Sequence, residues 1–192
     1  RRFERELKEI LKRSAREKSD GALLLIDLDN FKSVNDQLGH HVGDELLVEF
    51  AELLTSAVRS TDIVARFGGD EFAIILPEAD QTVATAVGAG IVDAVRRRFG
   101  GRPNVLHRVT ASIGIVTFAE ARYQGTDLFL LADQLLYDAK HSGRDRFASL
   151  VPAVGDSRPA PPAVSRRRVE EILDEDALSL ELQPILEIDS GR

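Results

Sequence analysis

The 192-residue sequence contains no cysteine. It therefore excludes disulfide bonds, cysteine-ligated zinc, iron–sulfur centres and thiol nucleophiles. The absence fits a reducing compartment, and we expect a cytoplasmic domain. No apolar run approaches the roughly 18 residues of a membrane helix, and no signal peptide is visible. Because the chain begins with Arg1 rather than Met, we expect a fragment of a longer protein, for which membrane attachment stays open.

An excess of positive charge is also missing. The chain has 25 Lys and Arg against 32 Asp and Glu, so 25 − 32 gives a formal net charge of −7. Because binding to a nucleic-acid duplex depends on neutralising phosphates, we expect no nucleic-acid partner. A small phosphorylated ligand held by a local site stays open. The sequence has no GxxxxGK[ST] phosphate loop and no internal repeat at a fixed period.

Proline is scarce outside one segment. Residues 151–165 read VPAVGDSRPAPPAVS and hold four of the seven prolines. This composition is typical of a semi-rigid linker. We therefore expect a main domain over residues 1–150, a linker over 151–165, and a second piece over 166–192 that is too short to fold alone.

Apolar spacing in residues 1–150 alternates between the helical and strand periods. It predicts helices near residues 3–15, 31–38, 44–58, 83–95 and 126–143, and strands over 22–28, 62–67, 71–76, 109–118 and 146–150, the last at a sheet edge. Gly68 and Gly69 join two of these strands, which indicates a tight hairpin with positive φ at both glycines. The order predicts an α/β fold, an α+β sandwich in which helices cover one mixed sheet with a central hairpin.

Three acids fall at strand ends. Asp27 interrupts a buried apolar run, and Asp70 and Glu71 follow the glycine turn. A buried ionised carboxylate needs a partner. If the hairpin pairs with the strand of Asp27, the three carboxylates converge, as in sites that bind Mg²⁺ together with substrate phosphates. Each acid taken singly is better explained as a turn or solvated residue, but the three together favour a metal.

Three segments carry a family resemblance. Residues 66–72 read RFGGDEF and resemble the signature of the GGDEF family of diguanylate cyclases. Residues 27–44, DLDNFKSVNDQLGHHVGD, resemble the second motif of that family, and residues 139–144, AKHSGR, its third. The resemblance covers about residues 1–150 and implies a fold related to nucleotidyl cyclases and polymerase palm domains. It also implies that two GTP molecules condense to cyclic di-GMP and two pyrophosphates across a homodimer.

The resemblance implies a metal and a catalytic set. Asp27, Asp70 and the carbonyl of Leu28 would hold Mg²⁺ or Mn²⁺. Glu71 is a second acidic group that promotes deprotonation of the 3′-hydroxyl, so the catalytic residues would be Asp70, Glu71 and Lys140. Asp29 shares the strand face of Asp27 at i+2, but we do not assign it to the metal.

The resemblance also implies the substrate-binding residues, which are Phe31, Lys32, Asn35, Asp44, Gly68, Gly69 and Arg144. The first two open a helix whose N–H groups can take phosphates. Asn35 and Asp44 resemble the guanine-reading residues, whereas Lys140 and Arg144 resemble the side chains that hold the triphosphate. Simpler explanations stay open: a helix N-terminal acid at Asp44, a solvated Asn35, and cations that favour a helix C-terminus.

Residues 59–62, RSTD, occupy the position of the product-binding RxxD motif of the family. They predict feedback inhibition by cyclic di-GMP through Arg59 and Asp62. A helix-ending arginine followed by a turn aspartate explains the same residues without any ligand.

Residues 169–191 resemble the opening helix and first strand of an EAL phosphodiesterase domain. This suggests part of a GGDEF–EAL bifunctional protein. Our leading hypothesis is a metal-dependent diguanylate cyclase. The alternative is a catalytically silent GTP-binding module that regulates an attached EAL phosphodiesterase, and a protein-interaction scaffold is a third possibility.

Overall fold

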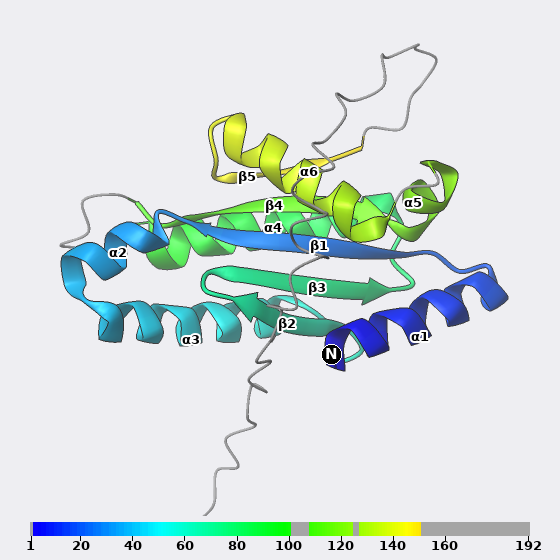
Figure 1. Ribbon diagram of the computed structural model, residues 1–192, viewed down its shortest axis with the longest axis horizontal. Helices are drawn as coiled ribbons and strands as arrows, with labels where there is room; N and C mark the ends of the chain where they lie inside the picture. The colour runs from blue at the N-terminus through cyan, green and yellow to red at the C-terminus, as the bar shows by residue number, and fades with distance from the viewer. Residues whose placement is uncertain (1, 101–107, 125–126, 151–192) are drawn as a thin grey trace, which may run out of the picture.

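The computed structural model describes residues 2–100, 108–124 and 127–150. The elements follow in the order α1 (Arg2–Glu17), β1 (Gly21–Asp29), α2 (Phe31–Leu38), α3 (His40–Ala57), β2 (Ile63–Gly68), β3 (Glu71–Pro77), α4 (Gln81–Phe99), β4 (Thr110–Thr117), α5 (Phe118–Gln124), α6 (Leu128–His141) and β5 (Arg146–Ser149). The strands form one sheet in the order β2-β3-β1-β4-β5 (Figure 1). The expected linker and the piece over 166–192 lie outside the described residues.

Strand β1 lies at the centre of the sheet. It pairs antiparallel with β3 and with β4, while β5 pairs parallel with β4 at one edge. Because successive side chains of a strand point to opposite faces, β1 contributes to two hydrophobic cores. Leu24 and Ile26 pack with the buried residues of α2, α3 and α4, whereas Leu23 packs with those of α1, α5 and α6. The mixed sheet covered by helices is the predicted fold class.

The two acids of β1 belong to the second of these faces. Asp27 and Asp29 are odd-numbered like Leu23, so they lie on the side of the sheet that α6 covers. Both are buried, with 8% and 2% of their surface exposed. The strand therefore carries two carboxylates to the end of a helix-covered face.

Helix α6 lies unusually close to the sheet because one position of β4 is glycine. A Cβ on Gly114 would collide with the backbone of α6 at Ala132 and Leu136. The missing side chain lets the helix backbone rest on β4. This contact fixes the height of α6 over the sheet and brings its last turn toward the end of β1.

The predicted start of the third helix is wrong. Helix α3 begins at His40, four residues before Asp44, because the chain turns at Gly39, which has φ 87° and accepts the N–H of Gly43. Its first turn is polar, with exposed His40 and His41, so apolar spacing did not detect it. Asp44 therefore lies beyond the first turn of the helix, which contains no acidic residue.

The hairpin also differs from the prediction. Gly68 pairs with Glu71, so the two-residue loop consists of Gly69 and Asp70, and of the two glycines only Gly69 has a positive φ, 49°. Positive φ at both glycines is therefore wrong. The hairpin is not central either, since β2 lies at the sheet edge and β1 occupies the middle.

Two further boundaries were misjudged. The strand predicted over 109–118 ends at Thr117, and a short helix, α5, follows that apolar spacing did not predict. The signal was present as Thr117-x-x-Glu120: each of these residues donates its backbone N–H to the side chain of the other, which is a capping box. Helix α6 is capped by Asp127, which accepts from Phe129 and Leu130; Thr126, the predicted first residue, lies outside the described residues.

Within the described residues, no helix combines the length and the apolar character that a membrane span needs.

Candidate active site

The tip of the β2–β3 hairpin lies against the end of β1. Glu71 is the cross-strand partner of Asp27, and the N–H of Leu28 donates to the carbonyl of Asp70 over 3.2 Å. Because the N–H and C=O of a strand residue point to the same side, the Leu28 carbonyl also faces the tip. The hairpin therefore pairs with the strand of Asp27, which is the condition under which the sequence placed the three acids together, and Asp27, Asp70 and Glu71 lie at one end of the sheet.

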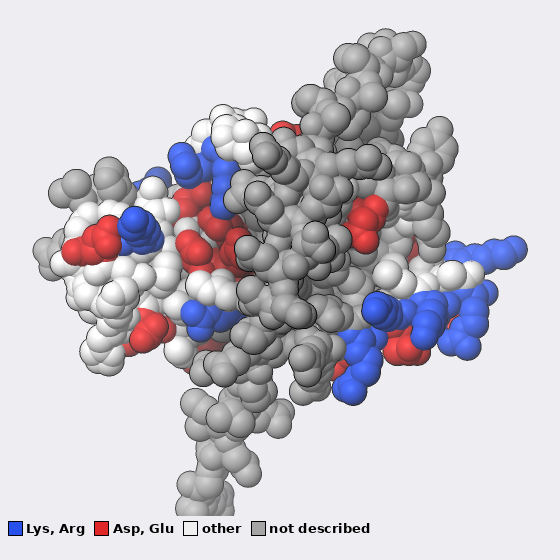
Figure 2. Space-filling view, viewed as in Figure 1, with Lys and Arg blue, Asp and Glu red and all other residues white. Residues whose placement is uncertain are grey.

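A lysine from α6 completes this group. Lys140 Nζ lies 2.7 Å from Asp27 Oδ2, and the side chain of Asp27 is 11% exposed. Lys140 comes from the last turn of α6, which Gly114 allows to rest on the sheet. Acidic atoms gather with basic atoms beside them on the face seen in Figure 2, near the end of the sheet where the hairpin turns in Figure 1.

Two carboxylates of this cluster, Asp27 and Glu71, have raised pKa values. Burial raises the pKa of Asp27 above its ordinary value, and the nearby Asp70 and Asp29 raise it further, although Lys140 offsets part of the effect. The pKa of Glu71 is raised by partial burial and by the charge of Asp27. Groups that repel each other in a poorly solvated place are stabilised by an added cation.

The donor set fits a divalent ion shared with a ligand. Within the described residues, no three acidic or histidine side chains gather tightly enough to hold a metal by themselves. Asp27, Asp70 and the Leu28 carbonyl supply oxygen donors only. Mg²⁺ commonly takes one or two carboxylates and fills its remaining positions with water and substrate phosphates.

The start of α2 opens beside this cluster. Asn30, which follows β1 directly, has φ 65° and does not cap the helix with its side chain; it donates instead to the carbonyl of Arg108. The first N–H groups of a helix have no partner within the helix. Phe31 is buried and Lys32 is exposed, so this helix start presents backbone donors beside an exposed ammonium group.

Asn35 lies against Gly43, the residue before Asp44. The Oδ1 atom of Asn35 occupies the position that a Cβ on Gly43 would take. The absence of a side chain at Gly43 therefore lets the carboxamide of Asn35 pack against α3. Asp44 itself is exposed. A helix N-terminal position, the simpler explanation for Asp44, is wrong because α3 starts at His40.

The two glycines of the hairpin leave open space. Apart from the neighbouring residues in the chain, no heavy atom of the described residues lies within 4 Å of the position that a Cβ would take on Gly68 or Gly69. Arg66, to which the sequence reasoning gave no role, donates from Nε to the carbonyl of Gly69 over 3.0 Å and braces the turn. The tip is therefore a fixed backbone surface that a ligand can approach.

Asp29 has a set of partners that the sequence did not reveal. Its carboxylate accepts from Thr110 Oγ1 (2.7 Å), Ser112 Oγ (2.8 Å) and the N–H of Asp145 (3.1 Å). Arg144 Nε lies 3.8 Å away, and the Arg144 side chain is 58% exposed. The detectable signal was the pair of polar residues at i and i+2 in β4, which face Asp29 from the neighbouring strand.

Arg59 and Asp62 form a closed turn. Asp62 Oδ2 accepts the N–H of Arg59 over 2.8 Å, and the N–H of Asp62 donates to the Arg59 carbonyl over 3.0 Å. The turn explanation of Asp62 is thus borne out, while the side chain of Arg59 is exposed.

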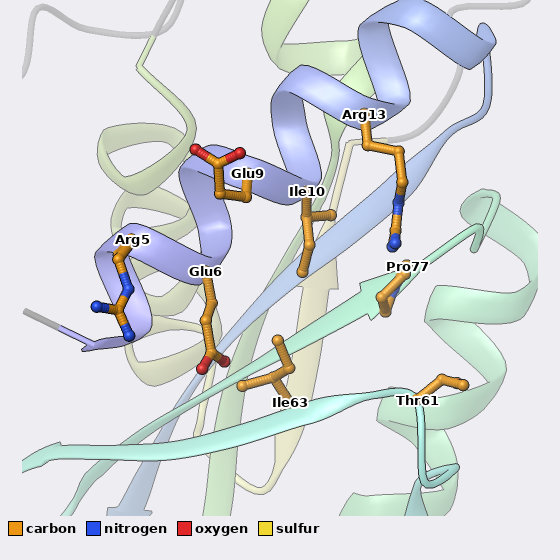
Figure 3. Close-up of a pocket in the computed structure, with 8 residues that line it drawn as sticks. All are labelled: Arg5, Glu6, Glu9, Ile10, Arg13, Thr61, Ile63 and Pro77. Atoms are coloured by element: carbon orange, nitrogen blue, oxygen red, sulfur yellow. The ribbon is translucent and has the colours of Figure 1, made fainter.

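A cavity of about 320 Å³ adjoins this turn (Figure 3). It lies between α1 and the hairpin strands, and is lined by Arg5, Glu6, Glu9, Ile10, Arg13, Thr61, Ile63 and Pro77. Since Pro77 pairs with Gly21 at the start of β1, the cavity lies at the opposite end of the sheet from Asp27. It is separate from the carboxylate cluster.

Comparison with known proteins agrees with this geometry. A family model described as "Diguanylate cyclase, GGDEF domain" matches residues 1–146. The probable diguanylate cyclase DgcE of Escherichia coli is 39% identical over 144 residues, which are 75% of this chain and 13% of DgcE. The bifunctional diguanylate cyclase/cyclic di-GMP phosphodiesterase MucR of Pseudomonas aeruginosa is 35% identical over 142 residues, 73% of this chain and 20% of MucR.

A solved structure shares the fold. The GGDEF domain of DgcB from Caulobacter crescentus, crystallised in complex with c-di-GMP, superposes with a TM-score of 0.67 at 27% identity, covering 77% of this chain and 87% of the other. The chain spans 13% to 35% of the length of the first curated relatives that it matches.

Proposed function

The chain belongs to the GGDEF diguanylate cyclase family, and we propose that it condenses two GTP molecules into cyclic di-GMP and releases two pyrophosphates. One observation carries the proposal: the strand register sets Glu71 opposite Asp27, and the Leu28 N–H binds the Asp70 carbonyl. Acids from two distant segments thereby share one end of the sheet with Lys140. Such an arrangement suits in-line displacement on a triphosphate.

We assign Asp27, Asp70 and the Leu28 carbonyl to a Mg²⁺ or Mn²⁺ ion. When bound, such an ion neutralises charge on the triphosphate and lowers the pKa of the attacking 3′-hydroxyl. Glu71 stands on the same face as Asp27 and is placed to accept the proton of that hydroxyl. Lys140, which already balances Asp27, adds positive charge where the phosphoryl group is transferred.

The remaining site residues bind and orient the nucleotide. We assign three groups to the phosphates: the first N–H groups of α2 at Phe31 and Lys32, the Lys32 ammonium and the exposed Arg144 guanidinium. Open space above Gly68 and Gly69 admits the nucleotide to the hairpin tip.

Asn35 and Asp44 would read the base. The acidic acceptor of Asp44 suits the N1–H and N2–H₂ donors of guanine, which adenine lacks on that edge. One domain then holds one GTP, so the reaction needs two domains facing each other. Because GTP is the proposed substrate, we place the working domain in the cytoplasm.

The test is formation of cyclic di-GMP from GTP and Mg²⁺ by this chain, followed by chromatography. We expect product from the wild type and a loss of turnover on the order of 10²-fold or more in Asp70→Asn, which keeps the shape of the side chain and removes its charge. Asp138→Asn makes the same change at an exposed position of α6 and should keep full turnover.

Full activity in Asp70→Asn would remove the metal assignment. Calorimetry that shows GTP binding without product, even at high protein concentration, would replace the proposal with the silent GTP-binding module. A chain that binds no nucleotide would contradict both.

We also propose that cyclic di-GMP inhibits the domain by binding at Arg59 and Asp62. The exposed guanidinium of Arg59 beside a rigid turn, next to the cavity bordered by Thr61 and Ile63, supports this role. We expect added product to inhibit the wild type and Ser60→Ala, but to inhibit Arg59→Ala much less. Equal inhibition of all three proteins would refute the assignment.

We propose, finally, that residues 166–192 begin an EAL domain joined through the linker at 151–165. The similarity of residues 1–146 to a bifunctional relative supports this organisation. A longer chain carrying the rest of that domain should hydrolyse cyclic di-GMP, and the present chain should not.

A further inference from the structure

The chain makes an unusual turn between α6 and β5. Gly143, Arg144 and Asp145 all have positive φ, at 112°, 59° and 52°. Two of the three are not glycine, and L-residues with side chains disfavour this region because Cβ approaches the backbone. Such a run of left-handed residues persists only where neighbouring groups determine it.

The inner side of the turn is fixed by the sheet. The N–H of Asp145 donates to Asp29 Oδ2 over 3.1 Å, and Asp29 is itself held by hydroxyl groups of β4. The N–H of Arg144 donates to the carbonyl of Ala139 over 3.1 Å, which ties the turn to the last part of α6.

The outer side of the turn is fixed by an arginine of α4. Arg96 Nε donates to Asp145 Oδ2 over 2.8 Å, and Arg96 Nη2 donates to the Asp145 carbonyl over 2.8 Å. A third bond, from Nη1 to Asp93 Oδ1 at 2.9 Å, orients the guanidinium from its own helix. Arg96 therefore holds both the side chain and the backbone of Asp145 with one planar fork.

The other carboxylate oxygen, Asp145 Oδ1, is buried and has no hydrogen-bond partner among the described residues. Without Arg96, neither oxygen of Asp145 would have a hydrogen-bond partner among the described residues. Because Oδ1 is buried while the side chain as a whole is 29% exposed, we expect the unpaired carboxylate to move toward solvent and to displace the turn.

We propose that Arg96 is a positioning residue for nucleotide binding: by clamping Asp145 it holds the left-handed turn that presents Arg144 to the phosphates. This inference rests on the proposed function. Arg96 lies on α4, which packs on the opposite face of the sheet from α6, so it acts through Asp145 rather than by touching the nucleotide. The turn positions Arg144 for this role. Its Nε lies 3.8 Å from the carboxylate of Asp29, and its side chain is 58% exposed and thus accessible to a phosphate.

The test compares the wild-type chain with Arg96 and Arg97 variants. Calorimetry measures the affinity of each protein for 3′-deoxy-GTP in the presence of Mg²⁺. This probe has the triphosphate and the guanine but lacks the attacking hydroxyl. We expect Arg96→Ala to weaken its binding about tenfold, the effect of misplacing one charge-assisted contact. Arg97→Ala, one residue further along the exposed face of α4, should bind like the wild type.

Two readouts separate positioning from general stability. With GTP, Arg96→Ala should raise KM while kcat changes far less, and the amides of residues 143–146 should exchange hydrogen faster in the absence of nucleotide. The double variant Arg96→Ala/Arg144→Ala should bind no more weakly than Arg144→Ala alone, because Arg96 acts through Arg144. If Arg96→Ala does not fold, Arg96→Lys, which keeps the charge without the fork, should show the weaker binding.

Wild-type affinity in the Arg96 variants, or additive losses in the double variant, would overturn the inference and leave the proposed function intact. Absence of binding by the wild type itself would overturn the proposed function and this inference together.

Discussion

Asp27 shows how much of this site is decided by a single side chain. It lies in the central strand of the sheet, where an unpaired carboxylate is strongly disfavoured, and Lys140 offsets only part of the effect of burial on its pKa. Asp29, two residues on, is satisfied by hydroxyls and an N–H instead. The two acids on this face therefore differ: hydrogen bonds satisfy the carboxylate of Asp29, whereas the carboxylate of Asp27 is the one that we propose binds a cation.

Glu120 permits a test of residue-level electrostatics outside the active site. Burial raises its pKa above the ordinary value of 4.5, although the N–H and hydroxyl of Thr117 act in the opposite direction. The folded state thus binds this proton more tightly than the unfolded state. The stability that Glu120 contributes is complete below about pH 4.5 and is lost as the pH rises through the higher folded pKa.

Glutamine at position 120 cannot titrate. We therefore expect Glu120→Gln to remove the decrease in stability that wild type shows as the pH rises. The Tm of the variant relative to wild type should rise between about pH 4 and pH 7. Glu52→Gln, at an exposed position of α3, should show no such trend. A difference between Glu120→Gln and wild type that is constant across this range would contradict the assigned cause.

At the scale of elements, the contact of α6 with β4 governs the geometry of the site. The helix supplies Lys140 and leads into the turn of Arg144, and its height over the sheet is set where Gly114 meets the backbone of Ala132 and Leu136. A change of packing at this point is transmitted along a rigid helix to the carboxylates.

Gly114→Ala should therefore lower the free energy of unfolding by about 1–3 kcal/mol, since the added methyl group overpacks against a backbone that cannot rotate away. Gly90→Ala is the matched control: Gly90 is exposed in α4, and beyond its own stretch of helix the added methyl meets no atom of the described residues within 4 Å. The control should be stabilised by about 0.5–1 kcal/mol because alanine favours the helix. Urea denaturation of both variants measures the contrast; equal stabilities would show that α6 does not rest on β4.

Elements with a strong apolar period could be predicted from the sequence, and their boundaries could not. The run at 22–28 predicted β1 because a strand buried on both faces is apolar at nearly every position, here at all but Asp27. The starts of α3 and α5 escaped because their first turns are set by Gly39 and by the Thr117–Glu120 capping box. Such local hydrogen bonds leave no hydrophobic period.

At the scale of the molecule, the proposed reaction needs two copies of the domain. If each copy holds one GTP, the rate per protomer depends on the fraction that is paired. We expect this rate to fall in proportion to concentration, about tenfold per tenfold dilution, once the protein is mostly monomeric. Turnover measured over a dilution series, with size-exclusion chromatography on the same samples, checks this.

A constant rate per protomer in samples that elute as monomers would contradict catalysis across a dimer. The Asp70→Asn protein is a useful addition to the series. Mixed with wild type, it should form pairs with only one intact site.

The candidate site was predictable where it depends on motifs and sheet pairing, and not where it depends on long-range contacts. The acids could be placed together because β3 of the hairpin lies next to β1 in the sheet. Arg96 and Asp145 are 49 residues apart, and their meeting depends on how α4 and β5 pack. The local sequence around either residue therefore does not predict this contact.

The central position of β1 has one more consequence. Asp27 sits on a strand bound on both sides, so it moves only if two ladders break, whereas Lys32 and Arg144 belong to a short helix and a turn near the surface. On warming, local openings reach such peripheral segments first. If Lys32 and Arg144 bind the triphosphate as proposed, warming would weaken nucleotide binding while the proposed metal site is still intact, and activity would fall at temperatures well below the Tm.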